Sequence, residues 1–379
     1  MSQSKVVVIG AGAFGGWTAL WLQSQGLETT LLDGWGPGNS RASSGGETRV
    51  VRTIYGSDHF HWELAVRSIQ LWKECERRWE QNLFRRTGVL WMTTDLVDFV
   101  ESALPFLDSA DLPYQRLSLP EARVRYPQIN FEQVKSVVLE EEAGYVMARR
   151  SCRVVVEQFL QKGGTYHPCT ATPGTSQSGE LKELILSDGS KLKAEQYVFA
   201  CGPWLRQLFP EVLEDVLTVT RQEVFFFGPP TTHPYFQENH LPVWVDYGKK
   251  MVYGIPADGR RGFKIADDTQ GPQCDPTSTE RILSAESVRA AQAYAAFRFP
   301  QLKGAPLIEG RVCQYTNTVD HRFLIDRHPH INNILLVGGG SGHGFKHGPA
   351  VGEQVARLVK DDSEPPSQFS LSRFLGTPS

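Results

Sequence analysis

The first forty residues alternate apolar runs with a helical pattern. Residues 6–9 form a β-branched run that is typical of a strand buried on both faces of a parallel sheet. Residues 13–25 predict a helix, because three aromatic side chains recur on one face: Phe14, Trp17 and Trp21. Gly26 stands where a left-handed residue commonly ends a helix. A second strand over residues 29–32 then ends at Asp33, so the segment predicts a βαβ unit.

Amphipathic patterns predict three further helices. Residues 59–79 carry an apolar stripe behind a cap at Ser57 or Asp58. Ser118 and Glu121 have the spacing of a capping box for a short helix. Residues 148–162 continue the helical pattern until a pair of glycines. By contrast, residues 34–46 are rich in Gly, Ser, Asn and Pro and predict a long loop, which in a compact domain is usually functional or disordered.

The rest of the chain is richer in strand patterns. Residues 184–186 and 191–192 predict a hairpin, and the other predicted strands lie at 88–92, 197–200, 224–227, 243–245 and 334–337. The last of these strands enters a glycine-rich run at 338–344, which a helix to about residue 359 follows. The final fifteen or so residues are polar, and we expect them to be loosely held.

Composition excludes several classes of function. A chain of 379 residues exceeds the usual size of one core, so we expect two domains or one domain with an insertion. A formal net charge of −3 argues against bulk nucleic-acid binding. The six cysteines show no CxxC pair, and neither they nor the histidines at 321, 328 and 330 have the spacing of metal ligands. With no leader pattern and no apolar run of about 18 residues, we expect a cytoplasmic protein without a membrane span.

A GxGxxG motif joins the first predicted strand to the first helix. In this context Gly10 permits a tight turn, Gly12 lets the backbone approach a diphosphate, and Gly15 allows close packing of helix on strand. The diphosphate would lie at the positive end of the helix. Asp33, 23 residues after Gly10, is placed to accept hydrogen bonds from ribose hydroxyls and disfavours a 2′-phosphate.

The spacing of the remaining strands favours FAD over NAD. A simple NAD enzyme would continue its sheet directly after Asp33, whereas here a Gly/Ser loop follows. The other candidate strands of that sheet, at 197–200 and 334–337, come far downstream. FAD is long enough to contact all three regions.

Three further motifs carry a resemblance to a known family. They are Glu47-Thr48-Arg49-Val50-Val51-Arg52 with Tyr55-Gly56, then Cys313-Gln314-Tyr315-Thr316, and Gly340-Ser341-Gly342-His343-Gly344-Phe345-Lys346. With them, the chain resembles over essentially its whole length the monomeric sarcosine oxidase and N-methyltryptophan oxidase group of flavoproteins, within the D-amino-acid-oxidase-like superfamily. The resemblance implies a thioether between Cys313 and the 8α-methyl group of FAD, and a neighbouring cation such as Arg311 could favour the reactive thiolate.

The resemblance also implies roles for other residues. Arg52 and Lys346 would bind the substrate carboxylate, which needs fixed cations in a desolvated pocket. Lys264 would face the flavin and activate oxygen, and Arg49 would pack against the flavin ring. Tyr253 and Tyr315 would line the substrate pocket. The remaining implied cofactor contacts are Ser43, Gly202, Gly340, Gly342 and Gly344.

Two positions depart from the family pattern. Ser44-Gly45 stand where a histidine pair is common, and Asp267-Asp268 stand where sarcosine oxidase has a histidine after the lysine. These differences argue against assigning sarcosine itself as the substrate. Asp268 either pairs with a second basic group on a larger amine or points to solvent.

The resemblance implies a mixed α/β fold. We expect a Rossmann-like FAD-binding domain of residues 1–85, 145–215 and 305–379, and an inserted antiparallel β-sheet substrate domain of residues 86–144 and 216–304. The implied reaction oxidises the C–N bond of a secondary amino acid, N-methyl or cyclic, to an imine. Oxygen would accept the electrons and give hydrogen peroxide, and the enzyme would be a monomer. Because cations surround the pocket, the amine is expected to bind neutral, without a general base.

Two alternatives stay open. One is a dehydrogenase, or a D-amino-acid or glycine oxidase, of the same fold that holds FAD noncovalently. The other is a flavin-binding module without enzyme activity.

Overall fold

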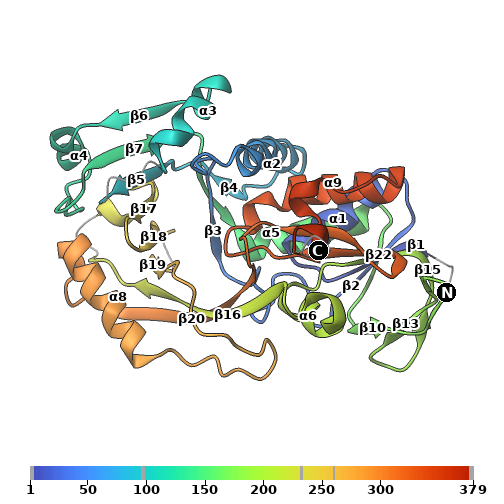
Figure 1. Cartoon of the computed structure of the whole chain (residues 1–379). Coiled ribbons are helices and arrows are strands. Elements are labelled where there is room, and N and C mark those ends of the chain that lie inside the picture. Colours follow the sequence, from blue (N-terminus) through green and yellow to red (C-terminus); the bar gives the residue numbers. More distant parts are fainter. Residues whose placement is uncertain (1–3, 95–98, 231–233, 259–260, 375–379) are drawn as a thin grey trace, which may run out of the picture.

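We analysed a computed structural model of the chain, which describes residues 4–94, 99–230, 234–258 and 261–374. Two large sheets dominate it (Figure 1). Within the described ranges, no helix combines the length and apolar character that crossing a bilayer requires. The mixed α/β class expected from the sequence is confirmed.

The first sheet has six strands in the order β21-β22-β15-β1-β2-β9. Their bounds are β1 (Ser4–Ile9), β2 (Thr29–Leu32), β9 (Thr165–His167), β15 (Ala194–Phe199), β21 (Leu324–His328) and β22 (Ile331–Gly338). All neighbours pair in parallel except β21 and β22. The buried apolar runs that predicted strands at residues 6–9, 29–32, 197–200 and 334–337 therefore lie side by side, as parallel strands covered on both faces should.

Helices cover this sheet (Figure 1). They are α1 (Ala13–Ser24), α2 (His59–Arg78), α5 (Ala148–Gln161) and α9 (Gly348–Asp361). Helix α1 packs against both α5 and α9, and α2 packs against α9. Three sequence predictions are confirmed here: Gly26 has a φ of +85° just after α1, Asp58 rather than Ser57 caps α2, and α5 begins at residue 148.

The second sheet has eight strands in the order β20-β16-β19-β18-β17-β5-β7-β6. Their bounds are β5 (Val89–Thr93), β6 (Tyr114–Leu117), β7 (Ser136–Glu140), β16 (Leu217–Phe227), β17 (Val243–Tyr247), β18 (Met251–Ile255), β19 (Phe263–Asp267) and β20 (Leu307–Thr318). Six of its pairings are antiparallel, but β17 and β5 run parallel, which the expected antiparallel sheet did not include.

Helix α8 (Ala285–Arg298) lies along this second sheet (Figure 1). Ala291, Ala295 and Phe299 join one apolar cluster with Phe263. Arg298 at the end of α8 is 2% exposed, and its guanidinium donates to the Asp246 carboxylate of β17 at 2.7 and 3.0 Å. The helix is thus fixed to the sheet by apolar packing and by a buried ion pair.

Smaller elements complete the fold. A three-stranded sheet joins β3 (Thr48–Val51), β8 (Gly144–Met147) and β4 (Phe84–Arg85). The predicted hairpin is confirmed as β13 (Leu184–Leu186) and β14 (Lys191–Leu192). The predicted capping box is also present, at the start of α4 (Leu119–Arg125).

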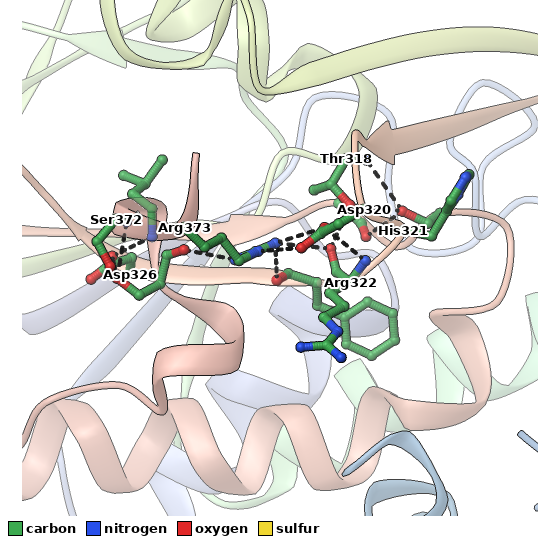
Figure 2. Close-up of polar contacts among 12 residues, drawn as sticks. Thr318, Asp320, His321, Arg322, Asp326, Ser372 and Arg373 are labelled. Atoms are coloured by element: carbon green, nitrogen blue, oxygen red, sulfur yellow. Dashed lines mark hydrogen bonds and ion pairs between the residues drawn. The ribbon is translucent and has the colours of Figure 1, made fainter. Parts of the chain in front are cut away.

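The expectation of a loose C-terminal segment is wrong for its described part. Phe369 is fully buried, and Arg373 donates to Asp320 at 2.8 Å, as Figure 2 shows. The Leu371 backbone N–H and the Ser370 hydroxyl both donate to the Asp326 carboxylate, at 2.6 and 2.7 Å. Apolar packing of Phe369 and these polar contacts together hold the segment, which its overall polarity did not indicate. Residues 375–379 lie outside the described ranges.

Candidate active site

A long cleft lies beyond the carboxyl ends of β1, β2, β15 and β22, where open α/β sheets bind ligands. Residues from the whole chain line it, including ten that the sequence predicted as site residues: Gly10, Gly12, Asp33, Ser43, Arg49, Gly202, Tyr315, Gly340, Gly342 and Gly344. The cleft is thus built from the three regions that were expected to contact one long cofactor.

The three glycines of the GxGxxG motif have different roles. A Cβ atom on Gly10 would lie 2.3 Å from the Ala200 carbonyl oxygen, and one on Gly15 would lie 1.8 Å from the Gly10 carbonyl oxygen. Gly15 therefore shapes the turn through packing and is not part of the cleft lining. At Gly12 a Cβ would approach only the Ser44 hydroxyl, at 3.2 Å, so the free space beside this glycine belongs to the cleft.

Asp33 is held in place by backbone donors. Its Oδ2 accepts from the Ala11 N–H at 2.8 Å, and its Oδ1 accepts from the N–H groups of Trp35 and Gly36 at 2.9 and 2.8 Å. Burial raises the pKa of Asp33, and these hydrogen bonds oppose the rise. Because each carboxylate oxygen has two lone pairs, the side chain keeps acceptor capacity toward the cleft.

The cleft fits a flavin dinucleotide. Three buried side-chain atoms that belong to lining residues have no hydrogen-bond partner among the described residues: Ser43 Oγ, Gln314 Oε1 and Thr316 Oγ1. Buried polar atoms without partners are rare unless a ligand or water satisfies them. A Cβ on Gly340 would make only ordinary contacts, at 3.6 Å or more, so the second glycine run also borders open space.

Arg49 and Lys264 share one anchor. The Thr48 carbonyl oxygen accepts from Arg49 Nη1 at 2.9 Å and from Lys264 Nζ at 3.1 Å, and Arg49 Nη2 also donates to the Ser43 carbonyl at 2.7 Å. Lys264 is 2% exposed and lies 5.5 Å from the centre of the Tyr253 ring. Burial, and then the charge on Arg49, lower the pKa of Lys264 to about 7. The structure therefore brings these two predicted site residues together.

Arg52 and Lys346 meet at Tyr55, although 294 positions separate them in the sequence. The Arg52 guanidinium carbon lies 4.3 Å from the centre of the Tyr55 ring, and Lys346 Nζ donates to Tyr55 Oη at 2.7 Å. Lys346 is 3% exposed, and burial together with the Arg52 charge lowers its pKa well below the ordinary range. Two cationic side chains that are close together and shielded from water, such as Arg52 and Lys346, can bind one anionic group.

A histidine cluster behind Tyr55 was missed by the sequence analysis. Tyr55 Oη contacts His343 Nδ1 at 3.1 Å and His347 Nε2 at 2.6 Å, and the His61 ring stacks on the Tyr55 ring at 5.4 Å. Burial, and next the charge on Lys346, lower the pKa values of His343 and His347. The spacing of His343 and His347 around Lys346 was the available signal.

A buried carboxylate near Arg52 was also missed. Glu140 is 2% exposed, and it accepts from the Thr53 hydroxyl at 2.7 Å and from Trp91 Nε1 at 3.2 Å. Burial raises its pKa, and Arg52 lowers it. Because Glu140 ends β7 and belongs to no motif, nothing in the sequence pointed to it.

Cys313 and Tyr253 lie at the edge of this region. Both are partly buried and pack against the apolar cluster of Val224, Phe226 and Ala266. Cys313 stands on β20, two residues before Tyr315. The neighbouring Arg311, named as a candidate cation for Cys313, instead pairs with the carboxylates of Glu47 and Glu309, the first at 2.8 Å.

The structure shows the contacts of Ser44 and Asp268, which depart from the family pattern. Ser44 Oγ accepts from the Ala13 N–H at 3.0 Å, so it binds the first turn of α1 where a histidine was expected. Asp268 is partly buried, and Tyr315 Oη donates to its Oδ1 at 2.9 Å. Of the two orientations considered for Asp268, solvent is therefore wrong, because its carboxylate faces the cleft tyrosine.

Comparisons with known proteins agree with this geometry. The family described as FAD dependent oxidoreductase matches residues 5–358. The chain is 29% identical to the monomeric sarcosine oxidase of Bacillus sp. (strain B-0618), over 93% of this chain and 91% of that protein. It is 25% identical to N-methyl-L-tryptophan oxidase of Yersinia pestis (strain Pestoides F), over 97% and 99%. Among solved structures, L-proline dehydrogenase from P. horikoshii shares the fold, with a TM-score of 0.86, 20% identity and 98% coverage of both chains.

Proposed function

Because the chain belongs to the family of FAD-dependent oxidoreductases, we propose that it oxidises a secondary amino acid, N-methyl or cyclic, at its C–N bond. The product is an imine, oxygen accepts the electrons, and hydrogen peroxide forms. The names of the relatives support this substrate class, since sarcosine and N-methyltryptophan are both N-methyl amino acids. The observation that carries the proposal is the pair Arg52 and Lys346 around Tyr55, which suits a substrate carboxylate.

FAD, when bound, takes up the two electrons and the hydrogen that leave the carbon next to the substrate nitrogen. Gly12 and Gly340 leave room for the dinucleotide, Asp33 is placed for its ribose, and Ser43 offers an unpaired hydroxyl. We propose that Arg49 packs beside the ring. The backbone at Gly342 lies close to the Tyr315 ring, since a Cβ atom on this glycine would meet the ring at 2.7 Å.

The chain's own residues orient the substrate. Arg52 and Lys346 hold the carboxylate, while Tyr253 and Tyr315 form polar walls of the pocket. Lys264 lies away from the carboxylate cations, on the Thr48 carbonyl beside Arg49, and we propose that its charge stabilises the negative charge that develops on oxygen. Burial of Lys264 and Lys346 strengthens their electrostatic effect.

We also propose that Cys313 attaches FAD covalently. Its support is the motif around it and its place on β20, two residues from the cleft residue Tyr315. Acid precipitation of the holoenzyme tests the bond: the yellow colour should stay with the polypeptide, and should move to the supernatant in Cys313→Ser. Cys274→Ser is the control, because Cys274 is a partly buried thiol outside the cleft lining. Colour released from the unmodified protein would refute the linkage.

The division into domains is part of the proposal. Residues 1–85, 145–215 and 305–379 contain all six strands of the first sheet, and they would hold the dinucleotide. Residues 86–144 and 216–304 contain seven of the eight strands of the second sheet, and they would cover the substrate. Strand β20 belongs to the first set by sequence but pairs with β16, so it would connect the two parts.

A substrate panel tests the proposed reaction. N-methyl amino acids, cyclic imino acids, primary amino acids and amines without a carboxylate are mixed anaerobically with the holoenzyme, and bleaching of the flavin is followed. We expect bleaching with secondary amino acids and hydrogen peroxide after oxygen is admitted. If only amines that lack a carboxylate bleached the flavin, the role of Arg52 and Lys346 would be refuted. Bleaching without any peroxide would indicate a dehydrogenase.

A further inference from the structure

Asp268 places a carboxylate beside the residues proposed to bind the substrate. It directly follows β19, and its backbone N–H donates to the Met251 carbonyl at 2.9 Å, which fixes it against β18. Tyr315 Oη, from β20, donates to one carboxylate oxygen at 2.9 Å. Within the described part of the chain, Tyr315 is the side chain that hydrogen-bonds this carboxylate, which leaves acceptor capacity for another donor.

The charge of Asp268 acts on groups from several elements. It raises the pKa values of Tyr55, Tyr253 and Tyr315, in each case behind the larger effect of burial. It also acts on Lys346, whose pKa it raises against the stronger effect of burial. The carboxylate therefore contacts Tyr315 directly and lies near enough to Tyr55, Tyr253 and Lys346 for its charge to act on them.

Asp268 does not pair with the nearby cations. Arg52 and Lys346 lower the pKa of Asp268, behind burial and the Tyr315 hydrogen bond, while Asp267 raises it. Yet among the described residues no ion pair within 4.0 Å joins Asp268 to Arg52 or Lys346. Asp267, its neighbour, is exposed and pairs with Lys250 at 3.6 Å. Two cations on Tyr55 and one carboxylate on Tyr315 thus influence one another without pairing, an arrangement that would suit the two ends of a zwitterion.

We propose that Asp268 binds the protonated amine of the substrate and accepts its proton before the C–N bond is oxidised. This inference rests on the proposed function. A secondary amino acid in neutral water carries an ammonium group, and only the neutral nitrogen has a lone pair that can assist the departure of hydrogen from the adjacent carbon. In the step, the N–H bond breaks, its electron pair stays on nitrogen, and an O–H bond forms on the carboxylate.

The environment favours this transfer from both sides. Burial raises the pKa of Asp268, which makes its carboxylate a stronger base than an exposed aspartate. The charges on Arg52 and Lys346 lower the pKa of a nearby ammonium group. Under this proposal the amine enters protonated, in place of the neutral amine that the sequence led us to expect, because a carboxylate is present to receive its proton. The proton returns to solvent after the product leaves.

Binding of two unreactive analogues provides a test without turnover. Trimethylammonioacetate carries a fixed cation, and 3,3-dimethylbutanoate has the same shape and carboxylate without that charge. Their dissociation constants are measured at pH 8 from changes in the flavin spectrum of the holoenzyme. We expect the unmodified protein to prefer the cation by about tenfold or more. Asp268→Asn and Asp268→Ser should both lose this preference, and Asp267→Asn, the matched control, should keep it.

The pH dependence of anaerobic flavin reduction provides the second readout. In Asp268→Asn, the apparent pKa for the reduction rate should move up toward that of the free amine, and the rates should converge with the unmodified enzyme above it. An unchanged profile and an unchanged analogue preference would overturn the role of Asp268. If Asp268→Asn lost activity only with substrates that carry a second amine, the proposed role of Asp268 would also be overturned. If no amine reduces the flavin of the unmodified enzyme, the proposed function fails, and the analogue pair still decides what Asp268 binds.

Discussion

Replacing Lys264 by methionine should stabilise the flavin-free protein. The lysine is 2% exposed, and burial is the main reason that its pKa falls from 10.5 to about 7. Methionine has a similar length and carries no charge. The variant loses the hydrogen bond to the Thr48 carbonyl, which Arg49 Nη1 still satisfies at 2.9 Å, and the charge over the Tyr253 ring. The substitution therefore removes an unfavourable burial without leaving an acceptor unpaired.

The size of the effect follows from proton linkage. Between pH 7 and 10.5 the unfolded chain binds more protons at this lysine than the folded chain, so stability rises with pH across that window. At about 1.4 kcal/mol per pKa unit, the lysine costs about 4 kcal/mol of folding free energy at pH 7 and about 1 kcal/mol at pH 10. After about 1 kcal/mol for the lost hydrogen bond, Lys264→Met should gain about 3 kcal/mol at pH 7 and almost nothing at pH 10.

Urea denaturation of the flavin-free protein at both pH values measures this difference. Lys250→Met is the control, because Lys250 is 68% exposed and should change stability little at either pH. Flavin reoxidation by oxygen should slow in the holoenzyme of Lys264→Met. If the variant is no more stable than the unmodified protein at pH 7, or if its gain does not shrink by pH 10, the assignment of a buried, destabilising lysine is wrong.

Three other substitutions test the fold around the site. Gly15→Ala should abolish FAD binding, seen as loss of the flavin spectrum, because its Cβ would lie 1.8 Å from the Gly10 carbonyl oxygen. Arg298→Met should cost about 3–5 kcal/mol in urea denaturation because it leaves the Asp246 carboxylate buried without its cation, and a loss below about 1 kcal/mol would contradict this. Arg373→Ala should lower stability by about 1–2 kcal/mol, measured as a lower Tm, and an unchanged Tm would show that the C-terminal contacts are weak.

Local patterns predicted most elements because local interactions determine them. The helix expected over residues 148–162 is found at Ala148–Gln161, and the hairpin and the capping box were correct. The parallel pairing of β17 with β5 joins segments about 150 residues apart. Whether this pair is parallel or antiparallel depends on how the chain between the two strands crosses the sheet, and local sequence patterns do not determine that path.

The site was predictable where a motif carries its own geometry. The glycines at 10, 12 and 15 act within one turn, so sequence spacing determines what each does. The orientation of Asp268 depends instead on the register of β18 against β19 and on the position of Tyr315. A shift of one residue would turn its carboxylate to the other face of the sheet. The sequence therefore left two orientations open.

The candidate active site concentrates buried ionisable groups that destabilise the fold. Burial lowers the pKa values of Lys264 and Lys346 and raises those of Glu140 and Asp268, so each group is less stable in its charged form than in water. Mutual pairing would remove much of that cost, yet Asp268 and Lys346 do not form an ion pair. A ligand with separated positive and negative ends would satisfy both at once, and its binding free energy would include the relief of their desolvation. An amino acid zwitterion has that form, so the unpaired charges of Asp268 and Lys346 would favour it as a ligand.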